Sequence, residues 1–242
     1  MSTKPNIVLM HGAWADGSSW SKVIPILSEA GYNVVATQQK LVSLEDDVET
    51  VRRAAEALDG PALLVGHSYG GAIITEAAHV CPNVNGLVYI AGFALDKGES
   101  LEILSASGPV APPGAAAIRP DKYGFLWIDR EMFAENFCQD ADKIQAAVMA
   151  ATQKPLSLAC FQGKITDAGW KNLPCWYQVS LNDRMIPPPA EQFMAQRINA
   201  RLISLSSSHA SLVAHPKEVA DFILTAANDI YASAGVEEAV HA

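Results

Sequence analysis

Cysteine is scarce in this sequence and is not arranged for a metal site or a disulfide framework. The 242 residues include four cysteines, and none of them forms a CxxC or CxxH pair: Cys81, Cys138, Cys160 and Cys175. A structural zinc site and a disulfide scaffold are therefore both disfavoured. We expect the four thiols to be buried as small apolar side chains, and we expect no metal.

Positive charge is also in short supply. The chain carries 17 Lys and Arg residues against 26 Asp and Glu residues, a net charge of −9, and 18% of its residues are charged. Without a basic surplus to neutralise phosphates, neither nucleic acid nor an anionic membrane is an expected partner. The low charge density is compatible with a homodimer contact. Half of the residues are hydrophobic, which argues against disorder and suits one full-sized α/β domain or two small ones.

Long hydrophobic runs are absent. The longest apolar stretch, 87–95, is about half the length of a membrane-spanning helix and contains Gly92. The first six residues offer one lysine, and no apolar run long enough for a signal peptide precedes Gly12. We therefore expect a soluble, cytoplasmic protein.

Short strand-like runs alternate with helical patterns at both ends of the chain. In the helical patterns, apolar residues recur at the i, i+3, i+4, i+7 spacing of a helix with one buried face, most clearly after Pro216. Such alternation predicts an α/β fold with a mainly parallel sheet and helices on both of its faces. The expected strands are 6–10, 33–37, 62–65, 87–90, 176–180 and 201–205.

One segment, 96–170, interrupts this alternation. It contains a stretch rich in Pro, Gly and Ala (GPVAPPGAAAIRP, 108–120), followed by mixed apolar segments. We interpret it as an insertion that lies over the sheet as a cap or lid, so that 1–95 and 171–242 form the core. Aromatic residues of the cap are expected to line a substrate pocket together with core residues: Phe125, Trp127 and Phe133 from the cap, and Gly12, Trp14 and Phe93 from the core.

A candidate nucleophile stands directly after the third expected strand. The letters Gly66-His67-Ser68-Tyr69-Gly70 fit G-x-S-x-G between a strand and a helix. In a nucleophile elbow the glycines allow close approach of the backbone around a strained serine, and the helix N-terminus stabilises developing negative charge. The alternative is an ordinary tight turn with an incidental serine.

A serine hydroxyl needs a base, and an imidazole base needs an acid to orient it. Of the six histidines, His209 lies in a polar loop just after the last expected strand, whereas His215 precedes a proline and suits a helix entry. Asp183 ends the preceding strand, and 26 residues separate it from His209, enough for one helix and one strand. Asp183 could alternatively be a turn former, and Asp96, beyond the fourth strand, is the reserve candidate for the acid. The order Ser68, Asp183, His209 is the one expected of an α/β-hydrolase.

Acyl transfer also requires two N–H donors aimed at the oxyanion. The backbone N–H of Tyr69, next to the serine, is one candidate. The other should come from the loop after the first strand, where Gly12 permits a turn, and we assign it to the N–H of Ala13.

These motifs together resemble those of the α/β-hydrolase superfamily. The matching segments are VLMHGAWADGSSW, LVGHSYGG, SLNDRMIPP and SSHASLVAHP, and they are most similar to the small branch that contains plant methyl-ester esterases, hydroxynitrile lyases and bacterial carboxylesterases. The resemblance implies an α/β-hydrolase fold with Ser68 as nucleophile, His209 as base, Asp183 as acid, and the N–H groups of Ala13 and Tyr69 as oxyanion hole. It implies no cofactor.

Two departures from the family's motifs narrow the range of expected activities. The hydroxynitrile lyases of this branch carry Thr where this chain has Gly12, and Lys where it has Ala210, so cyanohydrin cleavage is disfavoured. Members with an Asp nucleophile are disfavoured by Ser68, whereas cofactor-free dioxygenases share the scaffold and are not excluded by any residue.

The sequence therefore predicts a serine hydrolase that cleaves a small, largely uncharged carboxylic ester through an acyl-enzyme. A small-molecule ester is the expected partner. Two alternatives stay open. One is a lactonase or a C–C bond hydrolase or lyase on the same triad. The other is a catalytically silent scaffold that binds a ligand.

Overall fold

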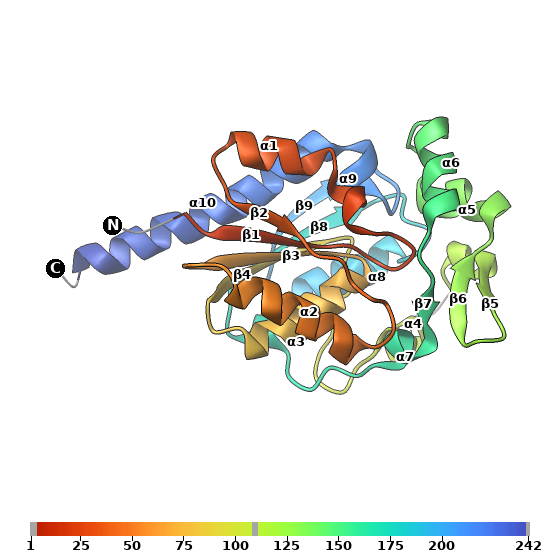
Figure 1. Cartoon of the computed structure of the whole chain (residues 1–242), viewed down its shortest axis with the longest axis horizontal. Coiled ribbons are helices and arrows are strands. Elements are labelled where there is room, and N and C mark those ends of the chain that lie inside the picture. The colour runs from red at the N-terminus through yellow and green to blue at the C-terminus, as the bar shows by residue number, and fades with distance from the viewer. Residues whose placement is uncertain (1–3, 108–110, 241–242) are drawn as a thin grey trace.

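The centre of the molecule is a six-stranded sheet, seen in a computed structural model that describes residues 4–107 and 111–240 (Figure 1). The other residues, including the start of the Pro/Gly/Ala stretch, lie outside the described part. Every strand pair in this sheet is parallel, which confirms the predicted α/β class. Its strands, from one edge to the other, are β2 (Val34–Ala36), β1 (Asn6–Met10), β3 (Ala62–His67), β4 (Val84–Ile90), β8 (Cys175–Ser180) and β9 (Arg201–Leu205).

Helices cover both faces of this sheet, as predicted. On one face α1 (Val23–Glu29) packs against α10 (Pro216–Val240), and α9 (Ser211–Ala214) lies beside them. The opposite face is covered by α2 (Leu44–Glu56), α3 (Tyr69–Val80) and α8 (Pro188–Arg197) (Figure 1). No helix within 4–107 and 111–240 is long and apolar enough to cross a bilayer.

Local sequence explains where these helices begin. The Ser43 hydroxyl accepts a hydrogen bond from the N–H of Asp46 and so caps α2. Ahead of α1, Asp16 caps a separate 3-10 turn, η1 (Gly17–Trp20). Buried strands follow from composition, since all six residues of β3 are buried between the two helical layers.

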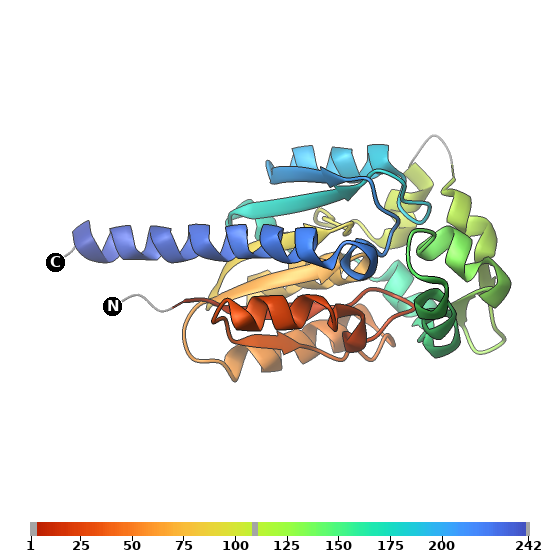
Figure 2. The ribbon, with the colours of Figure 1, turned by 90° about the horizontal axis from the view of Figure 1, so that it is seen from above.

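The segment 96–170 folds at the carboxyl end of the main strands (Figures 1 and 2). Its strands form a second, antiparallel sheet that the sequence patterns did not indicate, because each strand has two to four residues. The elements in chain order are α4 (Leu101–Ser107), η2 (Pro113–Ala117), β5 (Ile118–Pro120), β6 (Phe125–Ile128), α5 (Arg130–Phe137), α6 (Lys143–Thr152), β7 (Leu156–Ser157), α7 (Leu158–Gln162) and η3 (Gly169–Lys171).

Candidate active site

Ser68 occupies a strained turn between β3 and α3. Its φ of 53° and ψ of −122° lie outside the region that side chains other than glycine readily adopt. The flanking glycines are sterically required. A Cβ on Gly66 would lie 2.4 Å from the carbonyl oxygen of Gly70, and one on Gly70 would lie 2.7 Å from the carbonyl oxygen of Met10. The G-x-S-x-G spacing therefore produces the elbow geometry at Ser68.

Asp183 and His209 meet in the interior although 26 residues separate them. Nδ1 of His209 lies 2.5 Å from Oδ2 of Asp183, and both side chains are completely buried. The other carboxylate oxygen, Oδ1, accepts the backbone N–H groups of Met185 and Ile186 at 2.6 and 2.8 Å. The Asp183 carboxylate is thus held by three donors, and His209 has its Nε2 free to face away from it.

The His209 ring lies beside the serine elbow. Its centroid is 4.8 Å from that of His67, the residue before Ser68. Nε2 of His209 is buried, and the hydrogen bonds among the described residues give it no partner, Ser68 included. Such contacts between nucleophile and base are often long when no substrate is bound.

A buried polar layer beneath the site fixes the His209 loop. The Ser207 hydroxyl donates to Oγ of Ser180 at 3.0 Å, and the Ser211 hydroxyl donates to Oε1 of Gln178 at 2.6 Å. All four side chains are fully buried. Because Gln178 and Ser180 belong to β8, these two bonds tie the loop on both sides of His209 to the central sheet.

Three further contacts hold the same loop from other directions. The carboxylate of Asp140 accepts the N–H of Ser208 at 2.7 Å, and Nε2 of His67 lies 2.9 Å from the carbonyl oxygen of His209. The ring of Phe137 stands edge-on to the His209 ring with centroids 5.0 Å apart. The carbonyl acceptor requires a proton on Nε2 of His67, and burial, followed by the neighbouring His209, lowers the pKa of His67 well below its usual value.

The peptide between Gly12 and Ala13 is oriented by His11. Nδ1 of His11 donates to the carbonyl oxygen of Gly12 at 2.8 Å, while its Nε2 accepts the N–H of Gln39 at 3.1 Å, which assigns the neutral tautomer. In a trans peptide the C=O and the N–H point in opposite directions. Holding the Gly12 carbonyl on one side therefore directs the Ala13 N–H to the other.

Gly12 itself leaves no room for a side chain. A Cβ at this position would lie 2.7 Å from Cβ of Ser68 and 3.0 Å from Nδ1 of His67. The residue therefore sits directly against the elbow. The threonine of the lyases would not fit here without displacing Ser68.

Tyr69, the second expected donor, is anchored at its far end. Its hydroxyl donates to Oδ2 of Asp47 at 3.1 Å, and the other carboxylate oxygen accepts the N–H of Leu41 at 3.1 Å. Both Tyr69 and Asp47 are fully buried, and burial raises the pKa of Asp47. This contact fixes the first turn of α3, from which the N–H of Tyr69 projects.

An apolar cavity of about 100 Å³ opens beside Ser68. Two of the predicted pocket residues, Trp14 and Phe93, line it, and a second cavity of about 40 Å³ shares five of its lining residues. No charged side chain is found among the described residues that line either space. The first cavity is lined by Ala13, Trp14, Ser68, Tyr69, Phe93, Leu101, Ser105, Pro112, Ala115, Ile118, Leu156, Phe161, Met185 and Ile186.

Four predicted pocket residues lie outside this lining: Phe125, Trp127, Phe133 and Gly12. The first two belong to the small antiparallel sheet, where the indole N–H of Trp127 donates to Asp121 at 3.0 Å. Phe133 is fully buried against Phe137, with ring centroids 5.0 Å apart. Phe133 thus belongs to the interior of the segment 96–170, whereas Phe125 and Trp127 are only partly buried.

Sequence reasoning missed several residues near the site. Met185 and Ile186 line both cavities, and Phe137 packs on His209. The first two were detectable in principle, since they come two and three residues after the expected acid. The position of Phe137 on α5 had no comparable signal.

The reserve candidates lie elsewhere. Asp96 forms a 2.5 Å ion pair with Lys171 near the surface, which lowers the pKa of that carboxyl, while Asp183 contacts the imidazole of His209. His215 lies 3.3 Å from Asp140, at the entry to α10, and is not paired with Asp183.

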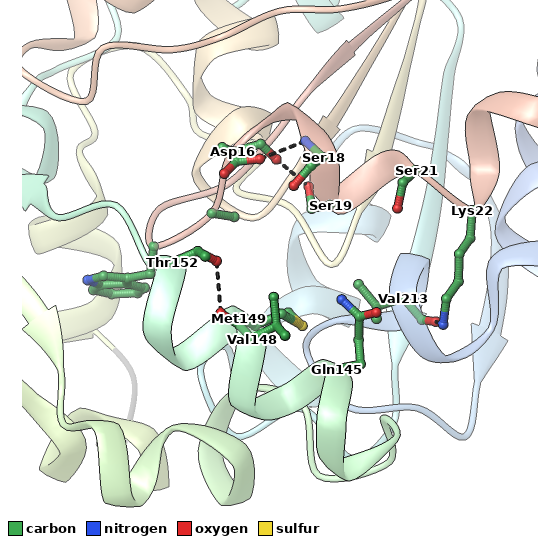
Figure 3. A pocket seen from close by; sticks show the side chains of 12 residues that line it. Asp16, Ser18, Ser19, Ser21, Lys22, Gln145, Val148, Met149, Thr152 and Val213 are labelled. Atoms are coloured by element: carbon green, nitrogen blue, oxygen red, sulfur yellow. Dashed lines mark hydrogen bonds between the residues drawn. The ribbon is translucent and has the colours of Figure 1, made fainter.

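A more polar cavity of about 50 Å³ lies between η1 and α6 (Figure 3). Its lining includes Asp16, Lys22 and Gln145, and it shares Trp14 with the cavity at Ser68. Ser68 is not part of its lining, so the elbow faces the apolar cavity instead. Within the described ranges no group of three or more His, Cys, Asp or Glu residues is placed to hold a metal ion.

The arrangement agrees with comparisons to known proteins. A model of the alpha/beta hydrolase family matches residues 7–222. A carbendazim hydrolyzing esterase of Nocardioides sp. is 34% identical over 112 residues, which span 41% of this chain and 46% of that esterase. Methylesterase 2 of Arabidopsis thaliana is 21% identical over 255 residues, 93% of this chain and 97% of the methylesterase.

A solved structure gives the same fold. The crystal structure of a pyrethroid hydrolase from Sphingobium faniae JZ-2 has a TM-score of 0.84 at 26% identity, covering 93% of this chain and 98% of that one. This chain belongs to the alpha/beta hydrolase family, in the branch that includes the plant methylesterases, and is a carboxylesterase-like hydrolase.

Proposed function

We propose that this chain is a serine hydrolase that cleaves a small, largely uncharged carboxylic ester through an acyl-enzyme. The observation that carries the proposal is the fully buried Asp183–His209 pair, whose free Nε2 lies beside the elbow of Ser68. A serine alone is a weak nucleophile, and this arrangement supplies the base that it needs.

In the first half-reaction His209 Nε2 takes the proton of the Ser68 hydroxyl as Oγ attacks the ester carbonyl carbon. Asp183 stabilises the imidazolium that forms. The N–H groups of Ala13 and Tyr69 hold the tetrahedral oxyanion. The intermediate collapses when the imidazolium gives its proton to the leaving alcohol oxygen, and an acyl-Ser68 ester remains.

Water completes the reaction by the same steps. His209 takes a proton from the water molecule as its oxygen attacks the acyl carbonyl, and the same two N–H groups hold the second oxyanion. The imidazolium then returns the proton to Oγ of Ser68. The products are the carboxylic acid and the free enzyme, so no cofactor enters the balance.

The substrate class follows from the cavity. Burying a charged group of a substrate without a partner costs roughly several kcal/mol. The residues that line this cavity offer no charged partner. An ester with apolar acyl and alcohol parts is therefore favoured. The relatives named for carbendazim and pyrethroid hydrolysis support an ester-type substrate without specifying it.

We further propose that the segment 96–170 serves as the cap of this cavity, with 1–95 and 171–242 as the core. Residues of both parts line the cavity, among them Leu156 and Ile186. The indole N–H of Trp14 donates to the carbonyl oxygen of Leu126 at 2.9 Å, which joins the loop after β1 to the cap.

The test is hydrolysis of p-nitrophenyl esters from acetate to octanoate by the wild type, Ser68→Ala and Ser105→Ala. Ser105 lines the same cavity and serves as the matched control. Loss of turnover by about 10³-fold or more is expected for Ser68→Ala alone. Undiminished turnover in Ser68→Ala would refute the proposal.

Two other outcomes would redirect the assignment. Turnover of acyl lactones or β-diketones far above that of simple esters would favour the lactonase or C–C bond hydrolase alternative. Tight ligand binding that survives Ser68→Ala, with no ester turned over by the wild type, would favour a silent binding scaffold.

A further inference from the structure

A second carboxyl group, that of Glu191, is buried next to Asp183. Glu191 lies in the first turn of α8 and its residue is completely buried. Its Oε2 accepts the backbone N–H of Ser180, at the end of β8, at 3.0 Å. Its Oε1 is buried, and no N–H or O–H group among the described residues donates to it.

This environment does not suit a carboxylate. The groups that face Glu191 are Asp183, from the loop before α8, and Tyr177, from β8, and both are acids. Among the described residues no Lys, Arg or His pairs with Glu191, so nothing compensates a negative charge there. Burial, followed by the charge of Asp183, raises the pKa of Glu191 well above its usual value.

Protonation of Glu191 would give its unpartnered oxygen a hydrogen bond to make. A neutral carboxyl group has one O–H donor, and the Asp183 side chain beside it is an acceptor. A hydrogen bond between these two side chains raises the pKa of Glu191, as burial does. The carbonyl oxygen of the neutral group can then accept the N–H of Ser180.

We propose that Glu191 is a positioning residue of the active site, whose protonated carboxyl donates a hydrogen bond to Asp183 and holds it toward His209. This inference rests on the proposed function. This bond would hold the Asp183 carboxylate in addition to the N–H groups of Met185 and Ile186. Since the group is neutral, it adds no second negative charge to the pair that stabilises the imidazolium.

The kinetic test compares Glu191→Gln and Glu191→Met with the wild type in pH profiles of kcat and KM. Glutamine keeps a donor and an acceptor without charge, whereas methionine keeps the volume and has neither. Glu135→Gln is the matched control, because Glu135 is exposed and pairs with Arg184 near the same loop. Folding of each variant is checked by its thermal transition.

For Glu191→Gln we expect kcat/KM within about threefold of the wild type and an unmoved acid limb of the profile, because no charge is lost. For Glu191→Met we expect kcat lower by about 10- to 100-fold with little change in KM, the size of a lost bond to a charged group. An acid limb displaced by about half a pH unit in Glu191→Gln would show that the group was ionised and overturn the proposal.

Wild-type kinetics in a folded Glu191→Met variant would also overturn it, provided that Ser68→Ala is inactive. An active Ser68→Ala variant would instead refute the proposed function, so the two failures are distinguishable.

A readout independent of turnover remains if Glu191→Met fails to fold. A carboxyl that stays protonated only in the folded state stabilises the fold at low pH, and this contribution is lost as pH rises above its unfolded pKa near 4.5. The unfolding equilibrium constant of the wild type, relative to that of Glu191→Gln, should therefore increase about tenfold per pH unit above that value until Glu191 ionises. A ratio independent of pH would overturn the proposal.

Discussion

His11 allows the pH dependence of stability to be predicted in magnitude. Its ring is completely buried and makes two hydrogen bonds. Nδ1 donates to the carbonyl oxygen of Gly12, and Nε2 accepts the N–H of Gln39, a bond that requires the neutral form. Burial lowers the pKa of His11 from 6.5 to about 4, against the opposing effect of the Gly12 carbonyl. A proton on Nε2 would also displace the N–H of Gln39.

The direction in which stability changes with pH follows from the pKa values of His11 in the unfolded and the folded chain. Between pH 6.5 and about 4 the unfolded chain binds a proton at His11 that the folded chain does not, so stability falls as the pH falls. The full contribution is about 3 kcal/mol, from the difference between 6.5 and about 4 at roughly 1.4 kcal/mol per pKa unit. It is present above pH 6.5, and about 2 kcal/mol of it is lost by pH 5.

The variant that isolates this contribution is His11→Gln, because glutamine offers a donor and an acceptor and does not titrate. Urea unfolding at pH 7.5 and pH 5, followed by circular dichroism, gives the free energy of unfolding of both proteins. The wild type should lose about 2 kcal/mol more than the variant between these pH values. All other titrating groups, His67 included, are common to both proteins and cancel. Equal losses in the two proteins would refute the burial argument for His11.

The same residue connects stability with catalysis. His11→Gln should retain most of kcat/KM at pH 8, because the Gly12 carbonyl keeps its donor. His11→Leu removes that donor, and kcat should fall toward the ~100-fold loss that follows removal of one oxyanion donor. Equal activity of the two variants on a p-nitrophenyl ester would show that His11 does not orient the Ala13 peptide.

Three further predictions concern the site directly. Asp183→Asn should lower kcat for the p-nitrophenyl ester by about 10⁴-fold, because an amide does not stabilise the protonated His209; a loss below about tenfold would contradict that role. Gly12→Ala places a Cβ 2.7 Å from that of Ser68. Overpacking should lower the free energy of unfolding by about 1–3 kcal/mol, and the loss in kcat, expressed as a free energy of activation, should be larger. Thermal melts and rate measurements compare the two effects. Phe93→Ala should shift the preferred acyl chain to longer esters, because Phe93 lines both cavities, and an unchanged chain-length optimum would argue against it.

The central fold could be predicted because its information is local. The strands β1 and β3 are short apolar runs with clear ends, and burial on both faces removes the ambiguity of alternation. The glycines of the elbow could be predicted too. Gly70 lies so close to the carbonyl oxygen of Met10 that no side chain fits at the junction of strand and helix.

The interior of the segment 96–170 was beyond prediction because it depends on contacts across the fold. Strands of two to four residues, such as β7 (Leu156–Ser157), do not show a recognisable period. Whether an aromatic residue faces the cavity or its own segment is decided by neighbours far away in sequence. Phe133 and Phe137 pack against each other, but Phe137 also lies against His209, which is far away in sequence.

The clearest link between fold and function is the polar content of β8. A strand buried on both faces normally reads as an apolar run, yet Gln178 and Ser180 are completely buried within this one. Unpartnered, such groups would each destabilise the fold by about 1–3 kcal/mol. Both are instead bonded to the loop that carries His209, through Ser211 and Ser207. A local departure from the pattern expected of a strand thus coincides with the place where the chain has to hold an imidazole in position, and such departures are expected at functional sites.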